Sequence, residues 1–237
     1  MKPMFSYFGS KYKLAKIYGE PRHDLVIEPF AGSAAYSLYW EPKKVILLDT
    51  SPVIVSIWNY LIKATEKQIL ELPIKFDLIS DLGLEYGAEN LIGFWAAKGK
   101  ATPARSKSKW GRQYENSPDC KVWGEAVKER IASQLCKIRH WQCYEDNYNA
   151  LYKKTAHWFV DPPYQVAGKR YPHKVGSYEA MAKWVKSLDG FVQVCENEGA
   201  DYLPFKKLKL VNTYHHMGED GKRKAKYTSE VLYERGK

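Results

Sequence analysis

The stretch Trp158-Phe159-Val160-Asp161-Pro162-Pro163-Tyr164 indicates both the fold and a candidate site. Its three consecutive apolar residues predict a strand buried on both faces, which is typical of a parallel sheet covered by helices. Asp161 follows that strand directly, and ligands of open parallel sheets bind beyond the carboxyl ends of the strands. Pro162 and Pro163 have fixed φ angles and no backbone N–H groups, so they present carbonyl oxygens. The stretch therefore predicts a rigid group of oxygen acceptors beside the ring of Tyr164.

Such a group of acceptors suits a flat ligand that carries an NH₂ group. The exocyclic amine of adenine is a poor nucleophile because its lone pair is shared with the ring. Acceptors on both of its hydrogens would favour a pyramidal nitrogen and direct the lone pair at an incoming methyl group. Tyr164 is expected to stack on the base. We therefore predict catalytic roles for Asp161, Pro162, Pro163 and Tyr164, with a simple Asp-Pro turn at a strand end as the structural alternative.

Other apolar runs predict further strands on both sides of this one. They cover residues 25–27, 45–48, 191–195, 208–211 and 231–233. Between them, apolar residues recur with helical spacing over 54–61, 127–138 and 178–188. Strands that alternate with helices predict an α/β fold with a mostly parallel, doubly wound sheet.

Two further features follow the first two predicted strands. Glu28-Pro29-Phe30-Ala31-Gly32-Ser33-Ala34-Ala35 is rich in small residues, and Gly32 lets the backbone pass close to a ligand. The segment lacks the Gly-x-Gly-x-x-Gly pattern of dinucleotide-binding folds. Asp49 ends the second strand, where an acid is positioned to accept hydrogen bonds from ribose hydroxyls. The structural alternative for Asp49 is an exposed acid at a strand end.

In order and spacing, these segments resemble the Dam-type (D12 class) DNA adenine-specific methyltransferases. Tyr7-Phe8-Gly9-Ser10-Lys11 is similar to the family's Trp-Ala-Gly-Gly-Lys segment, whose aromatic residue and lysine contact S-adenosylmethionine. Phe30-Ala31-Gly32-Ser33-Ala34 is similar to its Phe-x-Gly-x-Gly segment, with Ala34 in place of the last glycine. The tail from Lys224 to Leu232 resembles the closing hairpin of the family. Asp146-Asn147-Tyr148 corresponds to the stretch that contacts the adenine of the cofactor.

The resemblance implies the Rossmann-like fold of S-adenosylmethionine-dependent methyltransferases, with an antiparallel C-terminal strand. It also implies methyl transfer from S-adenosylmethionine to the exocyclic amine of a flipped-out adenine in double-stranded DNA. No metal is needed, because the methyl donor is already activated. The residues that the resemblance assigns to cofactor binding are Tyr7, Lys11, Glu28, Phe30, Gly32, Asp49, Tyr148 and Asp161.

The resemblance covers residues 5–62 and 144–234 and fails in the middle of the chain. We therefore expect a catalytic core of residues 1–62 and 141–237, and a helical and loop insertion over 63–140 for target recognition. From about Gly93 to Pro118 the insertion is expected to be a basic loop without core elements. It would bind phosphates, or else form a solvated loop without a partner. The residues predicted to bind nucleic acid are Lys98, Lys100, Arg105, Lys107, Lys109 and Arg112.

Composition limits the remaining possibilities. The chain has 37 Lys and Arg against 27 Asp and Glu, and a net charge of +10 favours a polyanionic partner. Its longest apolar runs are far shorter than the roughly 20 residues of a membrane span, so we expect a soluble protein that stays inside the cell. The family resemblance implies the cytoplasm of a bacterium or of a phage-infected host, with a viral origin as one alternative. The four cysteines form no Cys-x-x-Cys pair, which a treble-clef or ribbon zinc site requires. Cys136, His140 and Cys143 fall on one helical stripe and could be three metal ligands, but we favour buried thiols and a helix histidine with structural roles.

Other functions remain open at the level of sequence. The same fold methylates other amines, such as adenine in RNA or cytosine in DNA. Cytosine enzymes usually resemble Ser-Pro-Pro-Tyr and amide enzymes Asn-Pro-Pro-Tyr, so Asp161 favours adenine. A nucleic-acid-binding homologue without catalytic activity is the alternative from a different class.

Overall fold

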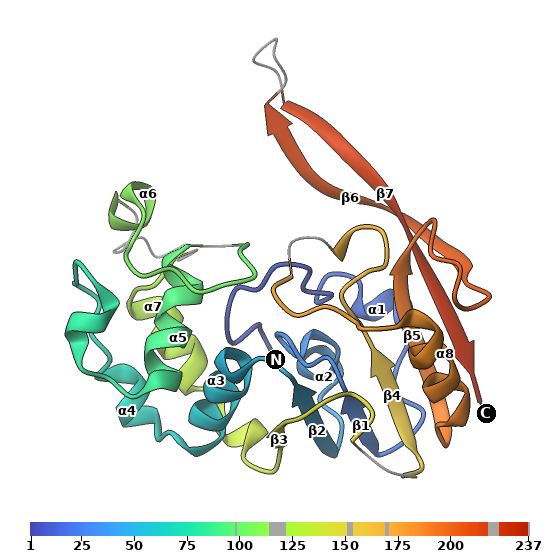
Figure 1. Cartoon of the computed structure of the whole chain (residues 1–237). Coiled ribbons are helices and arrows are strands. Elements are labelled where there is room, and N and C mark those ends of the chain that lie inside the picture. The colour runs from blue at the N-terminus through green and yellow to red at the C-terminus, as the bar shows by residue number, and fades with distance from the viewer. Residues whose placement is uncertain (98, 114–121, 151–153, 169–170, 218–222, 237) are drawn as a thin grey trace.

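The computed structural model describes residues 1–97, 99–113, 122–150, 154–168, 171–217 and 223–236. Within this part of the chain, a seven-stranded sheet has the order β3-β2-β1-β4-β5-β7-β6 (Figure 1). The strands are β1 (Leu25–Glu28), β2 (Lys44–Asp49), β3 (Gln142–Glu145), β4 (Ala156–Val160), β5 (Gly190–Asn197), β6 (Lys206–Met217) and β7 (Arg223–Arg235). Strands β1 to β5 are parallel, whereas β7 is antiparallel to β5 and to β6. The predicted mixed α/β fold with a mostly parallel sheet is confirmed.

Helices lie on both faces of the sheet. They are α1 (Ala15–Tyr18), α2 (Ala35–Trp40), α3 (Pro52–Lys63), α4 (Glu66–Leu70), α5 (Tyr86–Ala96), α6 (Lys109–Gln113), α7 (Glu125–Ala132) and α8 (Tyr178–Ser187), with 3₁₀ turns η1 (Ile79–Leu82) and η2 (Leu135–Ile138). Helix α8 packs on the face that carries Ile27, Ile46 and Trp158. Helices α1 and α2 cover the opposite face, which explains why the central strands carry buried apolar residues on both faces. No helix in the described ranges combines the length and apolar character that crossing a bilayer requires.

Helix α3 forms where its sequence pattern predicts it. Pro52 occupies the first turn, where its missing N–H costs nothing. Ile54, Ile57 and Trp58 are buried on one stripe of the helix. The side chain of Ser51 does not cap the helix, and its backbone N–H instead donates to Asp49 Oδ1 at 2.9 Å. The start of α3 therefore also fixes the acid at the end of β2.

The prediction of one continuous helix over 127–138 is wrong. The structure divides this stretch into α7 and η2, with Ser133 and Gln134 between them. The apolar positions Val127, Ile131 and Leu135 are nevertheless fully buried, because the 3₁₀ turn continues the same packing. Strand β3 was not predicted, since it is a short edge strand in which Cys143 alone is buried.

The expectation of a loop without core elements from Gly93 onward is also wrong. Gly93 lies in the last turn of α5, and the neighbouring Phe94 and Trp95 are buried. Trp95 donates its indole N–H to the Met4 carbonyl at 2.9 Å, which ties α5 to the N-terminal segment. Helices α3, α5 and α7 share one hydrophobic core with β2. The end of α5 is therefore buried against apolar side chains that are distant in the sequence, although its own stretch is poor in apolar residues. The division of the chain at residues 62 and 140 stays a prediction.

The close contact between α3 and α5 gives a test of this packing. A Cβ atom on Gly87 would lie 2.4 Å from the Ser56 carbonyl oxygen and 2.6 Å from Cβ of Tyr60. Gly87→Ala should therefore lower the free energy of unfolding by about 1–3 kcal/mol, as expected for overpacking. The measurement is urea denaturation, with Gly176→Ala as control because nothing lies within 4 Å of a Cβ there. Equal stability of the two variants would contradict the described contact.

Candidate active site

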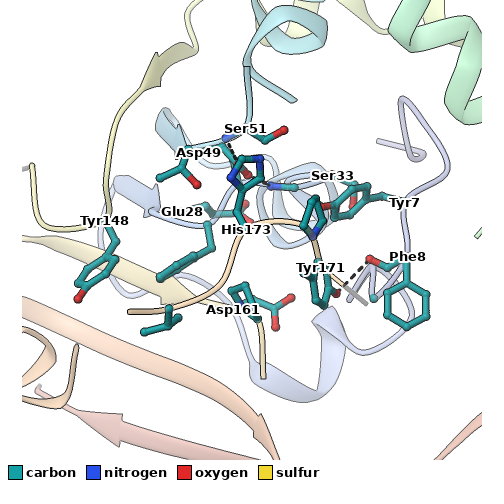
Figure 2. Close-up of a pocket in the computed structure, with 18 of the residues that line it drawn as sticks. Tyr7, Phe8, Glu28, Ser33, Asp49, Ser51, Tyr148, Asp161, Tyr171 and His173 are labelled. Atoms are coloured by element: carbon teal, nitrogen blue, oxygen red, sulfur yellow. Dashed lines mark hydrogen bonds between the residues drawn. The ribbon is translucent and has the colours of Figure 1, made fainter. Parts of the chain in front are cut away.

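A pocket opens at the carboxyl ends of β1, β2 and β4. Strands β1 and β4 are neighbours, but the helices that follow them, α2 and α8, lie on opposite faces of the sheet. Open α/β sheets bind ligands at such a switch point. Glu28 from β1, Asp49 from β2 and Asp161 after β4 all line the pocket, as Figure 2 shows.

Asp49 is held by two backbone donors. Oδ2 accepts the N–H of Gly32 at 3.0 Å, and Oδ1 accepts the N–H of Ser51 at 2.9 Å. Burial raises the pKa of Asp49, while the two N–H groups and the nearby His173 oppose that rise. The indole N–H of Trp58 in α3 donates to the Gly32 carbonyl at 2.9 Å, so α3 fixes the same loop from behind. The Asp49 carboxylate is thus a fixed acceptor at the pocket wall.

Gly32 is required by a close approach and by its backbone conformation. Its φ is +43°, and a Cβ atom there would lie 2.9 Å from the ring of Tyr7. Tyr7 therefore packs directly on the glycine. Ser33 Oγ donates to Ser10 Oγ at 3.0 Å, which joins the same two segments a second time. Ala34, which replaces the glycine of the resembled family, has a φ of +45° and still adopts the left-handed conformation.

Lys11 and Asp161 form a largely buried ion pair. Lys11 Nζ lies 3.1 Å from Asp161 Oδ1, and it also donates to the Gly9 carbonyl at 3.2 Å. Burial disfavours the charged form of Lys11, but the carboxylates of Asp161 and Glu230 outweigh this effect and raise its pKa. Burial likewise raises the pKa of Asp161, to about 6, although Lys11 opposes the rise. The Asp161 side chain keeps 22% of its surface exposed and lines the pocket (Figure 2).

The residues after Asp161 differ in whether their polar groups already have hydrogen-bond partners in the protein. The Pro163 carbonyl accepts the hydroxyl of Tyr178 at 2.7 Å, whereas the Pro162 carbonyl accepts no hydrogen bond from the described residues. The Tyr164 hydroxyl donates to Glu230 at 2.5 Å, and Lys11 Nζ lies 4.5 Å from the centre of the Tyr164 ring. Tyr164 does not line the pocket, in contrast to the expected stacking on a base. Pro162 is buried and, like Tyr164, does not line the pocket, whereas Asp161 and Pro163 do.

Glu28, Phe30 and Tyr148 complete one side of the pocket. Glu28 is only 3% exposed and accepts the N–H of Ser37 at 2.9 Å. Burial raises the pKa of Glu28 to about 8. The rings of Phe30 and Tyr148 are stacked with their centroids 5.4 Å apart, which gives this side an aromatic surface.

Three residues at the site were not predicted from the sequence. Tyr171 and His173 line the pocket from the segment after β4, and the Tyr171 hydroxyl donates to the Phe8 carbonyl at 3.3 Å (Figure 2). Glu230 reaches the site from β7. Neither Tyr171 nor His173 follows a strand end or belongs to a motif. Glu230 lies in the tail that resembles the family. This resemblance is the one feature of the sequence that could have indicated a role for Glu230 at the site.

The predicted nucleic-acid-binding residues are not equivalent. Lys98 lies outside the described residues. Lys100, Arg105 and Lys109 are exposed. The Lys100 carbonyl accepts the N–H of Phe8 at 3.1 Å, so this exposed segment adjoins the pocket rim.

The remaining two basic residues of the run have protein partners. Arg112 Nη1 lies 3.9 Å from Asp77, with about half of its side chain exposed. Lys107 is buried, and its ammonium lies 5.1 Å from the centre of the Phe76 ring. The expectation that Lys107 is a solvent-exposed phosphate contact is therefore corrected: its side chain folds inward over an aromatic ring.

Comparison with known proteins found a family model that matches the N-terminal part of the chain. Residues 7–83 match the model of the D12 class N6 adenine-specific DNA methyltransferases, which confirms the predicted resemblance over that segment. The segment contains Tyr7, Lys11, Gly32 and Asp49. No curated protein matches the chain. In the described ranges, no three His, Cys, Asp or Glu side chains are grouped so as to hold a metal ion.

Two similar solved structures are a chain described as "Putative methyltransferase yhhF from Escherichia coli" and a conserved hypothetical protein of Streptococcus pyogenes. The first is 11% identical, with a TM-score of 0.40, covering 95% of this chain and 81% of that chain. The second is 10% identical, with a TM-score of 0.36, covering 94% of each chain.

The raised pKa of Glu28 predicts a pH-dependent stability. Because its folded-state pKa of about 8 lies above the ordinary value of 4.5, the folded state holds a proton that the unfolded state has lost between those values. Stability should therefore fall as the pH rises through this window. The glutamine of the Glu28→Gln variant has no proton to lose. The difference in free energy of unfolding between this variant and wild type should therefore increase with pH, by at most about 1.4 kcal/mol per pH unit.

Urea denaturation at several pH values across this window measures the difference. Glu129→Gln, at an exposed position of α7, is the control and should differ from wild type by a constant amount. The same constant offset for Glu28→Gln would show that Glu28 is ionised throughout.

Proposed function

We propose that this chain transfers a methyl group from S-adenosylmethionine to the exocyclic amine of adenine in double-stranded DNA. The observation that carries the proposal is that Asp161 lines the same pocket as Gly32 and Asp49. The family match over residues 7–83 supports the assignment of that pocket to a methyl donor. The substrate and the donor are inferred from this family match together with the chemistry of the acceptors.

The pocket residues fit S-adenosylmethionine. Gly32 lets the Tyr7 ring pack against the pocket wall, and Asp49 is placed to accept the ribose hydroxyls. The stacked rings of Phe30 and Tyr148 offer an aromatic surface for an adenine ring. When bound, the donor supplies a methyl group on a positively charged sulfur. The carboxylate of Asp161 favours that charge in the partly buried pocket.

Asp161 and Pro162 would hold the target amine. A neutral NH₂ group has two hydrogens, and the Asp161 carboxylate, which lines the pocket, provides an acceptor for one of them. We assign the other to the Pro162 carbonyl, which accepts no hydrogen bond from the described residues but is buried outside the pocket lining, so the bound base would have to expose it. On methylation the nitrogen gains one carbon substituent and gives up one proton. Asp161, with its pKa raised to about 6, is placed to take that proton and release it to solvent.

A duplex base reaches such a pocket only when it is flipped out, at a cost of a few kcal/mol. We assign part of the compensating affinity to Lys100, Arg105 and Lys109, which are exposed. Of the three, Lys100 adjoins the pocket rim through its backbone contact with Phe8. The β6–β7 ribbon is a second candidate, because residues 223–229 continue beyond the pairing of β7 with β5 and rise from the pocket side of the sheet (Figure 1). A two-stranded ribbon fits the major groove, and basic residues of this one are Lys206, Lys207, Arg223, Lys224 and Lys226.

The central prediction concerns Asp161. Asp161→Ala removes an acceptor for the target amine and should lower the single-turnover rate of methyl transfer to unmethylated duplex DNA by at least about 100-fold. The measurement is transfer of labelled methyl groups from S-adenosylmethionine. Asp24→Ala is the matched control, since Asp24 is an exposed acid before β1, at the opposite end of the sheet. Activity of Asp161→Ala within tenfold of wild type would show that the reacting centre is misassigned.

A second prediction concerns DNA affinity. Replacing Lys100 and Lys109 by Ala should weaken DNA binding and reduce the slope of log K against log salt by about 2, because two phosphate contacts are lost. Fluorescence anisotropy at several salt concentrations measures this slope. The control replaces Lys43 and Lys44, which change the charge equally at the start of β2. An unchanged slope in the first variant would remove this segment from the interface.

A further inference from the structure

Glu230 is a buried carboxylate that the proposed reaction does not yet use. It lies in β7 opposite Asn197 of β5 and is 4% exposed. Its Oε1 accepts the hydroxyls of Tyr164 at 2.5 Å and Tyr18 at 2.8 Å. Its Oε2 accepts no hydrogen bond from the described residues. A buried carboxylate with a spare oxygen is costly unless a positive group lies within reach.

That positive group is Lys11. Its Nζ lies 3.9 Å from Glu230 Oε1 and 3.1 Å from Asp161 Oδ1, so one ammonium lies between two carboxylates. The Lys11 side chain is almost fully buried, and no other basic residue is recorded within ion-pair distance of Asp161 or Glu230 in the described ranges. Together the three groups carry one net negative charge when all are ionised.

The observed arrangement is not the one that the target amine needs. While Lys11 engages Asp161, the Asp161 carboxylate is a weaker acceptor for a neutral NH₂ group. An ammonium at this position also disfavours the positive charge that develops on the nitrogen as it is methylated. The reaction therefore requires a second place for the Lys11 ammonium.

We propose that Glu230 is a positioning residue that takes over the Lys11 ammonium when Asp161 engages the target amine. This inference rests on the proposed function. A lysine ammonium is a compact charge on a flexible stem with three donors, so it exchanges partners without moving the backbone. The hydrogen bond from Tyr164 holds Glu230 against the Asp-Pro-Pro-Tyr segment, so the second partner stays in place during the exchange.

The charge of Glu230 also acts on Asp161 directly. Burial raises the pKa of Asp161, the charge of Glu230 adds to that rise, and Lys11 opposes it. Other titratable groups that interact with these carboxylates come from every neighbouring element. They are Tyr7 of the N-terminal segment, Tyr18 of α1, Glu28 of β1, Tyr171 after β4, and Cys195 and Glu196 of β5. Glu230 differs from these groups because it contacts both the Tyr164 hydroxyl and the Lys11 ammonium directly.

The test is Glu230→Gln, which keeps an oxygen for the two tyrosine hydroxyls and removes the charge. Single-turnover methyl transfer is measured against pH at saturating DNA and S-adenosylmethionine. We expect the plateau rate to fall at least tenfold, because Lys11 stays on Asp161. The acid limb of the pH–rate profile should move to lower pH, because the pKa of Asp161 falls when the negative charge of Glu230 is removed.

The matched control is Glu234→Gln on the same strand. Glu234 accepts a hydrogen bond from Gln193 at 2.8 Å but has no contact with Lys11. Its plateau rate and acid limb should equal those of wild type. The affinity of Glu230→Gln for S-adenosylmethionine, measured by calorimetry, should stay within threefold of wild type.

Three outcomes would overturn the inference. A Glu230→Gln enzyme with the wild-type plateau and acid limb has no need of the second carboxylate. A lower plateau with an unmoved acid limb and a lower melting temperature shows that Glu230 only supports the fold. Absence of methyl transfer by the wild-type enzyme overturns the proposed function itself, and the role of Glu230 with it.

Discussion

The ion pair between Lys11 and Asp161 joins the beginning of the chain to the end of β4, and the pocket depends on this connection. Both side chains are largely buried, and removing one partner of a buried pair costs about 3–5 kcal/mol. The pair also places the N-terminal segment, so that the Tyr7 ring lies on Gly32. This electrostatic contact thus sets the position of the acceptor and of one pocket wall, while Asp49 and Trp58 hold the loop that carries Gly32.

The sheet explains why these groups meet. Parallel strands end at one edge, and the helices that follow β1 and β4 leave toward opposite faces, which opens a crevice between them. Glu28, Asp49 and Asp161 are all strand-end acids and therefore converge there. Burial raises the pKa values of all three groups, and the charge of Asp161 adds to the rise at Glu28. The concentration of carboxylates also makes the pocket suitable for a positively charged methyl donor.

The sequence predicted those features of the fold and the site that short stretches of residues determine by themselves. Strands apolar on both faces, the amphipathic helix α3 and the acids after β1, β2 and β4 are all visible in short windows. Strand β3 was missed because its pairing with β2, not its composition, makes it a strand. The inward fold of Lys107 over Phe76 and the approach of Glu230 to Lys11 depend on tertiary contacts across tens or hundreds of residues. No local pattern encodes such contacts.

The account rests on oxygen acceptors that hold an adenine amine, so identifying the methylated base tests it most directly. Unmethylated plasmid DNA treated with the purified protein and S-adenosylmethionine can be read by single-molecule sequencing, and its nucleosides by mass spectrometry. The account predicts N6-methyldeoxyadenosine at a recurrent sequence context, which the Asp161→Ala protein fails to produce. Methylated cytosine, or DNA without any added methyl group, would contradict it.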